Sequence, residues 1–145
     1  MSTALRISFE PDNETAKQFV TNSLDNFNIA TTGQAAYWPV AYFLRGPDNE
    51  ILGGLLGEIW GHWLHIKYIW VAEPARGAGH ARTLVSAAED YATRRGCVGA
   101  FLETFTFQAR PLYEKLGYEL FGELKGYPPG HAMFFLRKIL DGGVT

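Results

Sequence analysis

The stretch that decides the fold is VAEPARGAGHA, from Val71 to Ala81. It completes the almost unbroken apolar run HIKYIWV, which predicts a buried strand. A proline and an arginine follow, then Gly77 and Gly79, and from Ala81 onward apolar residues recur at helical spacing. Glycines between a strand and a helix indicate that the backbone there must come close to another group. The motifs elsewhere in the chain indicate what that group is.

The sequence on both sides of this turn predicts an α/β fold. The helix that opens there is expected to end at Gly96. Before it, we expect two strands around the turn Gly46 to Asn49 and a third from His62 to Val71. The other expected elements are a strand from Arg6 to Phe9, a helix from Glu14 to Phe27, a strand over VGAFLETF (98–105), a short helix over QARPLYEKLG (108–117) and a closing pair of strands, YELFGEL (118–124) and HAMFFLRKIL (131–140). Hairpins and crossovers together predict one domain, residues 1–145, with a mixed, mostly antiparallel central sheet and flanking helices.

Composition narrows the classes of function. The 145 residues suit one domain, and 13 Lys and Arg against 15 Asp and Glu give a formal charge of −2, so no basic field exists for nucleic acid or an anionic membrane. No apolar run approaches the ~18 residues of a membrane span, and MSTALRISFEPDNE lacks the pattern of a secretory leader, so we expect a cytoplasmic protein. The single cysteine, Cys97, excludes an internal disulfide and is expected to be a small buried residue.

The two glycines predict a site for phosphate. Without Cβ atoms, Gly77 and Gly79 let successive backbone N–H groups face one concavity, to which the helix adds its unpaired N–H groups and the positive end of its dipole. Arg76 brings a charge that can pair with phosphate oxygens. The chain lacks the Gly-Lys-Ser/Thr of a nucleotide P-loop and the signals for ribose binding, which disfavours a plain nucleotide-binding domain. A tight turn without a ligand is the other interpretation.

Two motifs together resemble one family. The first is Arg-Gly-x-Gly-x-Ala, from Arg76 to Ala81, and the second is Leu-Tyr-Glu-Lys-Leu-Gly-Tyr, from Leu112 to Tyr118. In these motifs and in the order of its elements, the chain resembles the GCN5-related N-acetyltransferase (GNAT) superfamily. The resemblance implies a GNAT-like acyl-CoA N-acyltransferase fold over almost the whole chain. It also implies that the strand ending at Val71 splays from the next strand and that pantetheine pairs in the gap, as an added strand does.

The resemblance implies acetyl-CoA as the cosubstrate, with its pyrophosphate on the backbone of the glycine turn and its pantetheine on Val71. The N–H of Val71 is also implied as the donor to the carbonyl oxygen of the acetyl group. The implied contacts are Ile69, Trp70, Val71, Arg76, Gly77, Ala78, Gly79, His80 and Ala81. No metal is expected, because His62, His80 and His131 lack the helical i, i+4 spacing of a ligand pair.

Acetyl transfer to an amine needs a proton donor for the thiolate and a means of deprotonating the amine. Tyr113 falls on the position of the family's general-acid tyrosine, and a phenol of pKa ~10 can protonate a thiolate whose conjugate acid has a pKa near ~8.5. A core tyrosine is the alternative. For the base three residues stay open: Glu103, which resembles a family glutamate; His65, whose imidazole titrates near ~6.5; and Glu58. Water alone is the fourth possibility.

The expected reaction is direct transfer, in a ternary complex, to a primary amine of a small molecule or peptide. Aromatic residues are dense in the middle of the chain and should mostly be core. Some of them, with the loops KGYPPGH (125–131) and TTGQAAYW (31–38), are expected to wall the acceptor pocket. A second subunit could complete that pocket, so a homodimer is one of the partners considered. The alternative function is a non-catalytic acyl-CoA-binding or regulatory module.

Overall fold

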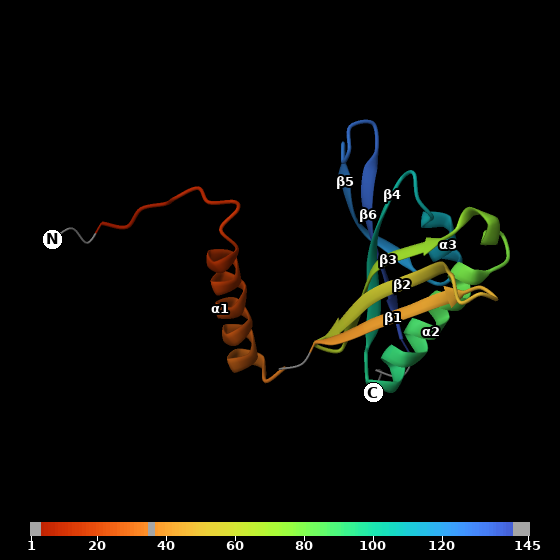
Figure 1. Ribbon diagram of the computed structural model, residues 1–145, viewed down its shortest axis with the longest axis horizontal. Coiled ribbons are helices and arrows are strands. Elements are labelled where there is room, and N and C mark those ends of the chain that lie inside the picture. The colour runs from red at the N-terminus through yellow and green to blue at the C-terminus, as the bar shows by residue number, and fades with distance from the viewer. Residues whose placement is uncertain (1–3, 35–36, 141–145) are drawn as a thin grey trace. The chain divides into compact units, whose positions relative to one another are not determined.

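The structure, a computed structural model, describes residues 4–34 and 37–140. Its elements in chain order are α1 (Glu14–Thr32), β1 (Trp38–Arg45), β2 (Ile51–Trp60), β3 (Trp63–Val71), a 3-10 turn (Glu73–Ala75), α2 (His80–Arg94), β4 (Gly99–Phe105), α3 (Arg110–Lys115), β5 (Glu119–Lys125) and β6 (Ala132–Ile139). The residues group into two compact units, 1–35 and 36–145, and each is described by itself (Figure 1).

The N-terminal unit corrects one prediction. The strand predicted from Arg6 to Phe9 is wrong, because residues 4–10 form no regular secondary structure. A strand is stable only beside a neighbour that completes its hydrogen bonds, and none of the paired strands takes this segment as a partner. Its side chains bond locally instead. Asn13 donates to Glu10 and caps α1 by accepting the N–H of Ala16 at 3.0 Å.

The helix α1 is longer than predicted. It begins at Glu14 as expected, but it continues past Phe27 to Thr32. Neither glycine nor proline occurs in residues 28–32, so nothing there breaks the helix. Gly33 ends it with a φ of +72° and donates its N–H to the carbonyl of Ile29 at 2.8 Å.

The second unit is built on a six-stranded sheet in the order β1-β2-β3-β4-β6-β5. All neighbouring strands are antiparallel except β3 and β4, which are parallel and joined by the crossover helix α2. The β1–β2 hairpin turns at Gly46 to Asn49, where the N–H of Asn49 bonds the carbonyl of Gly46. The mixed, mostly antiparallel sheet with flanking helices is therefore confirmed.

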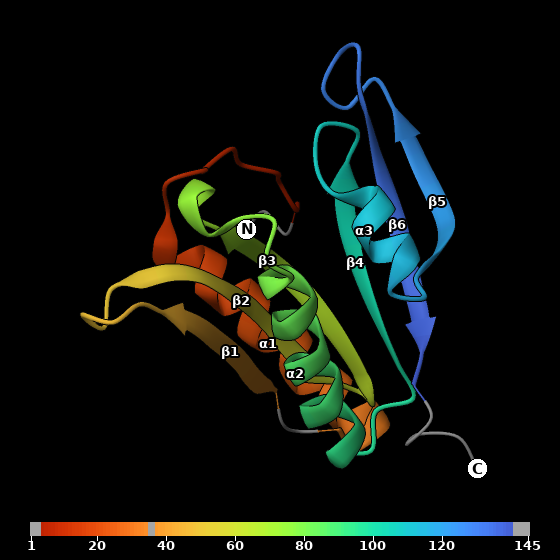
Figure 2. The same ribbon diagram turned by 90° about the vertical axis from the view of Figure 1, so that its right-hand side faces the viewer.

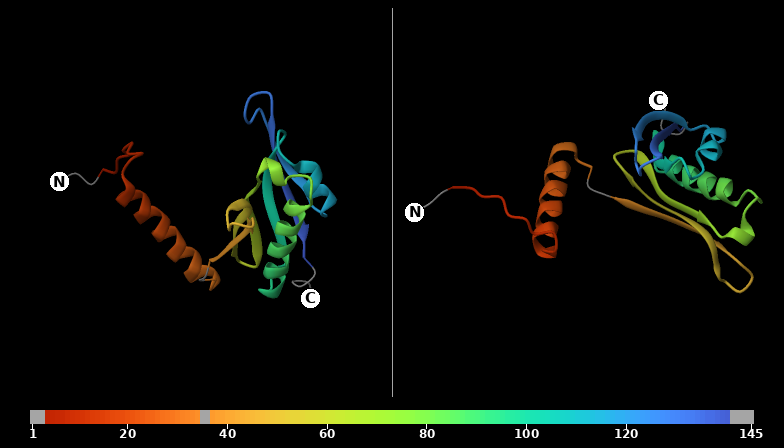
Figure 3. Two further views of the ribbon diagram at one scale, coloured as in Figure 1. Left: turned by 45° about the vertical axis from the view of Figure 1, so that its right-hand side comes forward. Right: turned by 90° about the horizontal axis from the view of Figure 1, so that it is seen from above.

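The core of this unit lies between the sheet and α2. The helix packs against β1, β2 and β3, and Figures 2 and 3 show it beside these strands from several directions. The buried residues of α2 are Leu84, Val85, Ala88 and Ala92, and those of the strands they pack with include Val40, Leu55, Ile59, Leu64, Ile66 and Leu102. Cys97 is fully buried, as predicted, and burial raises the pKa of its thiol.

A β-bulge in β3 shapes the middle of the sheet. The register with β2 slips between Leu56 and Gly57, so that Lys67 of β3 has no partner opposite it. A bulge of this kind bends a strand and increases its twist. Gly57 lies against the bulge, where an added Cβ would overlap the carbonyl oxygen of His65. Glycine at this position therefore allows the two strands to stay paired across the bulge.

Beyond the bulge, β3 and β4 separate. They pair only from Trp63 to Ile66 and from Gly99 to Leu102. The rest of β3, residues 67–71, pairs with β2 alone, and the rest of β4, residues 103–105, pairs with β6 alone. Figure 2 shows the two strands diverging from a common end. The sheet thus has the splay that the resemblance implied, and the backbone edges facing this gap lack a strand partner.

Candidate active site

The turn between β3 and α2 forms a hollow lined largely by main chain. Gly77 and Gly79 have φ angles of +82° and +81°, which favour glycine strongly. A Cβ built at either residue would have no atom within 4 Å, so the missing side chains leave open space. A cavity of about 360 Å³ occupies this place, lined by Val71, Ala75, Arg76, Gly77, Gly79, His80, Ala81, Arg82, Leu112 and Lys115.

The chemistry of this hollow suits a diphosphate. The N-cap of α2, Gly79, has no side chain to satisfy the first N–H groups of the helix, and the positive end of the helix dipole lies there. The cations Arg76, Arg82 and Lys115 are among the lining residues, and no carboxylate is. Backbone donors, a helix N-terminus and fixed cations are together the usual means of holding phosphate oxygens.

A second cavity, of about 400 Å³, continues the first toward the gap in the sheet. It is lined by Ile69, Trp70, Val71, Arg76, Ala81, Phe107, Gln108, Ala109, Leu112 and Tyr113, so the two cavities share four of their residues. The Nε of Arg76 donates to the carbonyl of Val71 at 2.9 Å, which fixes this side chain along the groove. Of the residues predicted to contact acetyl-CoA, all but Ala78 line one of these two cavities.

Tyr113 lies on α3 at the end of this groove. Its side chain is buried, and burial raises the pKa of its phenol. The ring packs edge-on against Tyr118 at 6.3 Å between centroids, and the Tyr118 hydroxyl in turn donates to Glu89 at 2.8 Å. Among the described residues, none forms a hydrogen bond with the Tyr113 hydroxyl. Tyr113 is therefore both a core residue and a lining residue of the groove, with its proton available.

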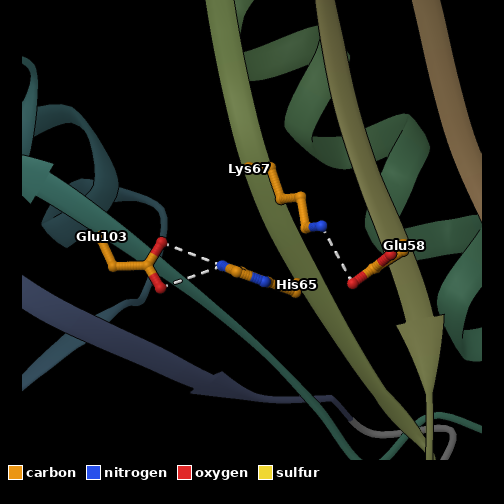
Figure 4. Close-up of polar contacts among 4 residues, drawn as sticks. All are labelled: Glu58, His65, Lys67 and Glu103. Carbon is orange, nitrogen blue, oxygen red and sulfur yellow. Dashed lines mark hydrogen bonds and ion pairs between the residues drawn. The ribbon is translucent and has the colours of Figure 1, made fainter. Parts of the chain in front are cut away.

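Two of the three candidate bases lie together across the start of the gap. The Nε2 of His65 on β3 lies 2.9 and 3.0 Å from the carboxylate oxygens of Glu103 on β4 (Figure 4). The imidazole stacks on Phe101 at 4.3 Å between centroids, which fixes the plane of the ring. With Nε2–H donating to Glu103, Nδ1 of the neutral ring is left as a proton acceptor.

Glu58, the third candidate, lies on β2 opposite His65 in the register. Its Oε1 is 3.0 Å from the ammonium of Lys67, the bulged residue. Figure 4 shows these two ion pairs on neighbouring strands, with α2 behind the strands. Glu58 is therefore engaged in a separate pair and is not bonded to the His65–Glu103 pair.

Sequence reasoning missed a further cavity, of about 300 Å³, at the turn between β2 and β3. Its lining residues are Tyr37, Glu58, Trp60, Gly61, Trp63, His65 and Phe101. The signal for this cavity in the sequence is the pair Trp60 and Trp63, which flank the two-residue turn between the strands. Of the two loops predicted to wall the acceptor pocket, TTGQAAYW contributes Tyr37, while Ala35 and Ala36 lie outside the described residues.

The other predicted loop, KGYPPGH, packs against the end of β4. Tyr127 lies 5.5 Å from Phe105 between ring centroids, and His131 lies 5.1 Å from Phe107. Within residues 4–34 and 37–140, no cluster of three His, Cys, Asp or Glu side chains could hold a metal ion. Nor does any described helix have the length and apolar character needed to cross a bilayer.

Comparisons with known proteins agree with this geometry. The family model described as acetyltransferase (GNAT) family matches residues 5–118. Blasticidin-S acetyltransferase of Streptomyces morookaense is 40% identical over 101 residues, which cover 69% of this chain and 74% of that protein. An acetyltransferase of Agrobacterium fabrum is 32% identical over 123 residues, 85% of this chain and 90% of that protein.

A solved structure has the same fold over almost the whole of this chain. The crystal structure of an acetyltransferase from Bacillus cereus superposes with a TM-score of 0.84 at 28% identity, covering 92% of this chain and 98% of that one. The match of the family model over most of the chain, the two curated relatives and this shared fold lead to one conclusion. The chain belongs to the GNAT family of acetyltransferases.

Proposed function

We propose that this chain is an acetyl-CoA-dependent N-acetyltransferase that acetylates a primary amine of a small molecule by direct transfer in a ternary complex. The observation that carries the proposal is the groove formed by the two adjoining cavities, which runs from the glycine turn to Tyr113. His65 and Glu103 pair where β3 and β4 separate. One end of the groove suits a diphosphate, and Tyr113 at the other end offers a phenol proton.

The residues that would hold acetyl-CoA are those of the groove. The turn from Arg76 to Ala81 offers backbone N–H groups and cations to the diphosphate, and the unpaired edge of β3 up to Val71 offers its backbone to the pantetheine. When bound, the cosubstrate supplies an activated acetyl thioester. No metal is part of the proposal, because Tyr113 and the His65–Glu103 pair are assigned the proton transfers.

The proposal gives each of these side chains a catalytic role. Glu103 holds Nε2–H of His65, so Nδ1 accepts the proton of the amine, directly or through one water. The amine nitrogen then bonds to the acetyl carbon as the carbon–sulfur bond breaks. Tyr113 donates its hydroxyl proton to the departing thiolate, and burial keeps this phenol protonated at neutral pH.

A small-molecule acceptor is supported by the relatives and by the size of the cavities. The 40% identical relative is named for the acetylation of blasticidin S, a small molecule. The cavity of about 300 Å³ that His65 lines is at the lower end of the volumes of small-ligand sites.

Thermal unfolding with acetyl-CoA, CoA, ATP and NAD in separate samples tests the cosubstrate. Ligand at a hundred times its Kd stabilises the native state by about 2.7 kcal/mol, a rise of several degrees in Tm. We expect this rise with both CoA species and with neither nucleotide. If neither CoA species raises Tm, the glycine turn does not bind the diphosphate of CoA and the proposal is wrong.

Tyr113→Phe tests the transfer. This variant should show the same rise in Tm with acetyl-CoA, while kcat for an amine panel, followed by thiol release, falls about 100-fold because a general acid is lost. Tyr91→Phe, a matched change on α2, whose hydroxyl accepts from Arg95, should keep full turnover. Unchanged turnover in Tyr113→Phe would remove this residue from the mechanism. A rise in Tm without turnover of any amine by the unmodified protein would identify a non-catalytic acyl-CoA-binding module.

A further inference from the structure

The edge of β4 that faces the gap carries backbone groups without a strand partner at Phe105. The N–H of the next residue, Thr106, donates to the carbonyl of Ala132 on the β6 side at 3.0 Å. Consecutive residues of a strand point their backbone groups to opposite sides, so the N–H and the carbonyl of Phe105 point to the side of β3. The ladder with β3 has already ended at Leu102, and Figure 2 shows the two strands apart beyond it. Phe105 therefore needs partners other than a strand.

Gln108 supplies these partners. Its Oε1 accepts the N–H of Phe105 at 2.9 Å and the hydroxyl of Thr104 at 3.3 Å. Its own backbone N–H donates to the carbonyl of Phe105 at 2.9 Å. A backbone N–H can only donate, so the amide atom of Gln108 that faces it is the oxygen. These contacts fix the carboxamide of Gln108 along the edge of β4 that faces the gap.

The other half of this carboxamide is a donor without a partner. Among the described residues, none accepts a hydrogen bond from Nε2 of Gln108. Gln108 lines the second cavity of the groove, together with Ile69 and Val71 from the part of β3 that pairs with β2 alone. No carboxylate is among the residues that line this cavity. The cavity thus combines the free backbone edge of β3 with a fixed N–H donor from the side of β4.

A ligand that lies in the gap must satisfy both of these sides. The backbone edge of β3 takes a partner that carries amide groups, as an added strand does. In such a partner the amide groups alternate in direction, so one carbonyl faces away from β3. The pantetheine arm of CoA contains two amide groups in series, and it is the part of the cosubstrate proposed to lie on β3. One of its carbonyls can therefore accept a hydrogen bond from Gln108.

We propose that Gln108 is a binding residue for the pantetheine arm and that its Nε2 donates to an amide carbonyl of that arm. The arm is then held between the edge of β3 and the carboxamide of Gln108, which Thr104 and Phe105 keep in place. This inference rests on the proposed function, because the ligand is the cosubstrate of the proposed transfer. It predicts an effect on the binding of CoA itself, whether or not the acetyl group is present.

Gln108→Glu removes the donor and keeps the rest of the contact. The carboxylate still offers oxygens to Phe105 and Thr104, so Tm without ligand should be unchanged. We expect Kd for CoA and for acetyl-CoA, measured by calorimetry, to rise by the same factor, at least about fivefold, because a hydrogen bond is lost and a carbonyl then faces a carboxylate. Adenosine 3′-phosphate 5′-diphosphate, which is CoA without the pantetheine arm, should bind both proteins equally. Gln18→Glu, which makes the same change of charge on α1, should bind CoA as the unmodified protein does.

Gln108→Met separates the donor from the added charge. Methionine has a similar length but no amide, so Kd for CoA should again rise about fivefold, now without a new carboxylate. In this variant the N–H of Phe105 and the hydroxyl of Thr104 lose their acceptor, so Tm without ligand should also fall. Weaker binding of CoA in both variants, with a lower Tm in only one of them, cannot come from a structural role alone.

Each of four other results overturns the inference. Unchanged Kd for CoA in both variants would show that Gln108 makes no contact with the arm, and the proposed acetyl transfer would stand. Equal weakening of CoA and of the nucleotide in Gln108→Glu would place the effect at the phosphates. Weaker binding of acetyl-CoA alone would make the thioester carbonyl the acceptor instead. If the unmodified protein binds no CoA species, the proposed function is wrong and so is this inference.

Discussion

Glu103 and His65 come from strands that separate directly beyond them. The parallel ladder ends at the pair Ile66 and Leu102, so His65 lies one residue before the end and Glu103 one residue after it. Their hydrogen bond therefore spans the start of the gap between the two strands. In the proposed mechanism the carboxylate accepts from one ring nitrogen and the other nitrogen is the proton acceptor, so the two residues would act as one unit.

A double-mutant cycle tests this unit at the residue scale. We expect His65→Gln and Glu103→Gln each to lower kcat/KM about 100-fold. The double variant should be no less active than the less active of the two single variants. Residues that act independently would instead give losses that multiply. The rise in Tm with acetyl-CoA should be the same in all four proteins, which controls for misfolding. Multiplying losses would contradict the pairing, and intact activity in both single variants would leave water as the base.

The sequence was able to name these residues but left the choice between them open. The two members of the pair are 38 positions apart, and the register of β3 with β4 brings them within bonding distance. The register of β2 with β3 places Glu58 opposite His65 and gives it another partner. The three candidate bases could thus be predicted from the sequence. Which of them pair could be seen only once the strands were in place.

At the scale of elements, the glycine turn and the end of β3 act together. The turn supplies an open hollow with positive φ angles at both glycines, and β3 supplies an unpaired edge that leads from this hollow to the catalytic candidates. The turn could be predicted because glycine and proline mark it plainly in the sequence. The bulge could not, since Lys67 interrupts an apolar run in a way that normal alternation also permits.

Gly79→Ala tests the hollow against a matched control. A Cβ at Gly79 meets no protein atom, so its effect is a strained backbone plus a methyl group in the space that the diphosphate would occupy. Gly130 has a φ of +83° and equally open surroundings, so Gly130→Ala carries the same strain, about 1 kcal/mol, away from the hollow. Both variants should lose similar stability, while Kd for CoA, measured by calorimetry, rises at least about tenfold only in Gly79→Ala. Equal affinities would show that the diphosphate lies elsewhere.

Across the second unit, buried ionisable groups make the free energy of unfolding depend on pH in the alkaline range. Burial raises the pKa of the Tyr113 phenol and of the Cys97 thiol, and burial together with Glu89 raises the pKa of Tyr118. In the unfolded chain a tyrosine loses its proton near pH ~10 and a cysteine near ~8.5. Between each unfolded value and the higher native one, the native state holds more protons, so the free energy of unfolding falls as pH rises.

Tyr113→Phe isolates one part of this dependence. Below pH ~8.5 these groups are neutral in both states and contribute no slope, so Tm should be flat with respect to them. Above pH ~10 the unmodified protein should lose Tm more steeply than Tyr113→Phe, which has no proton to lose, with each pKa unit between the states contributing about 1.4 kcal/mol. Scanning calorimetry at pH 8 and 10.5, with Tyr68→Phe as the exposed control, measures the difference. Parallel losses in all three proteins would mean that the Tyr113 hydroxyl ionises as freely in the fold as in water, so that burial does not raise the pKa of this phenol.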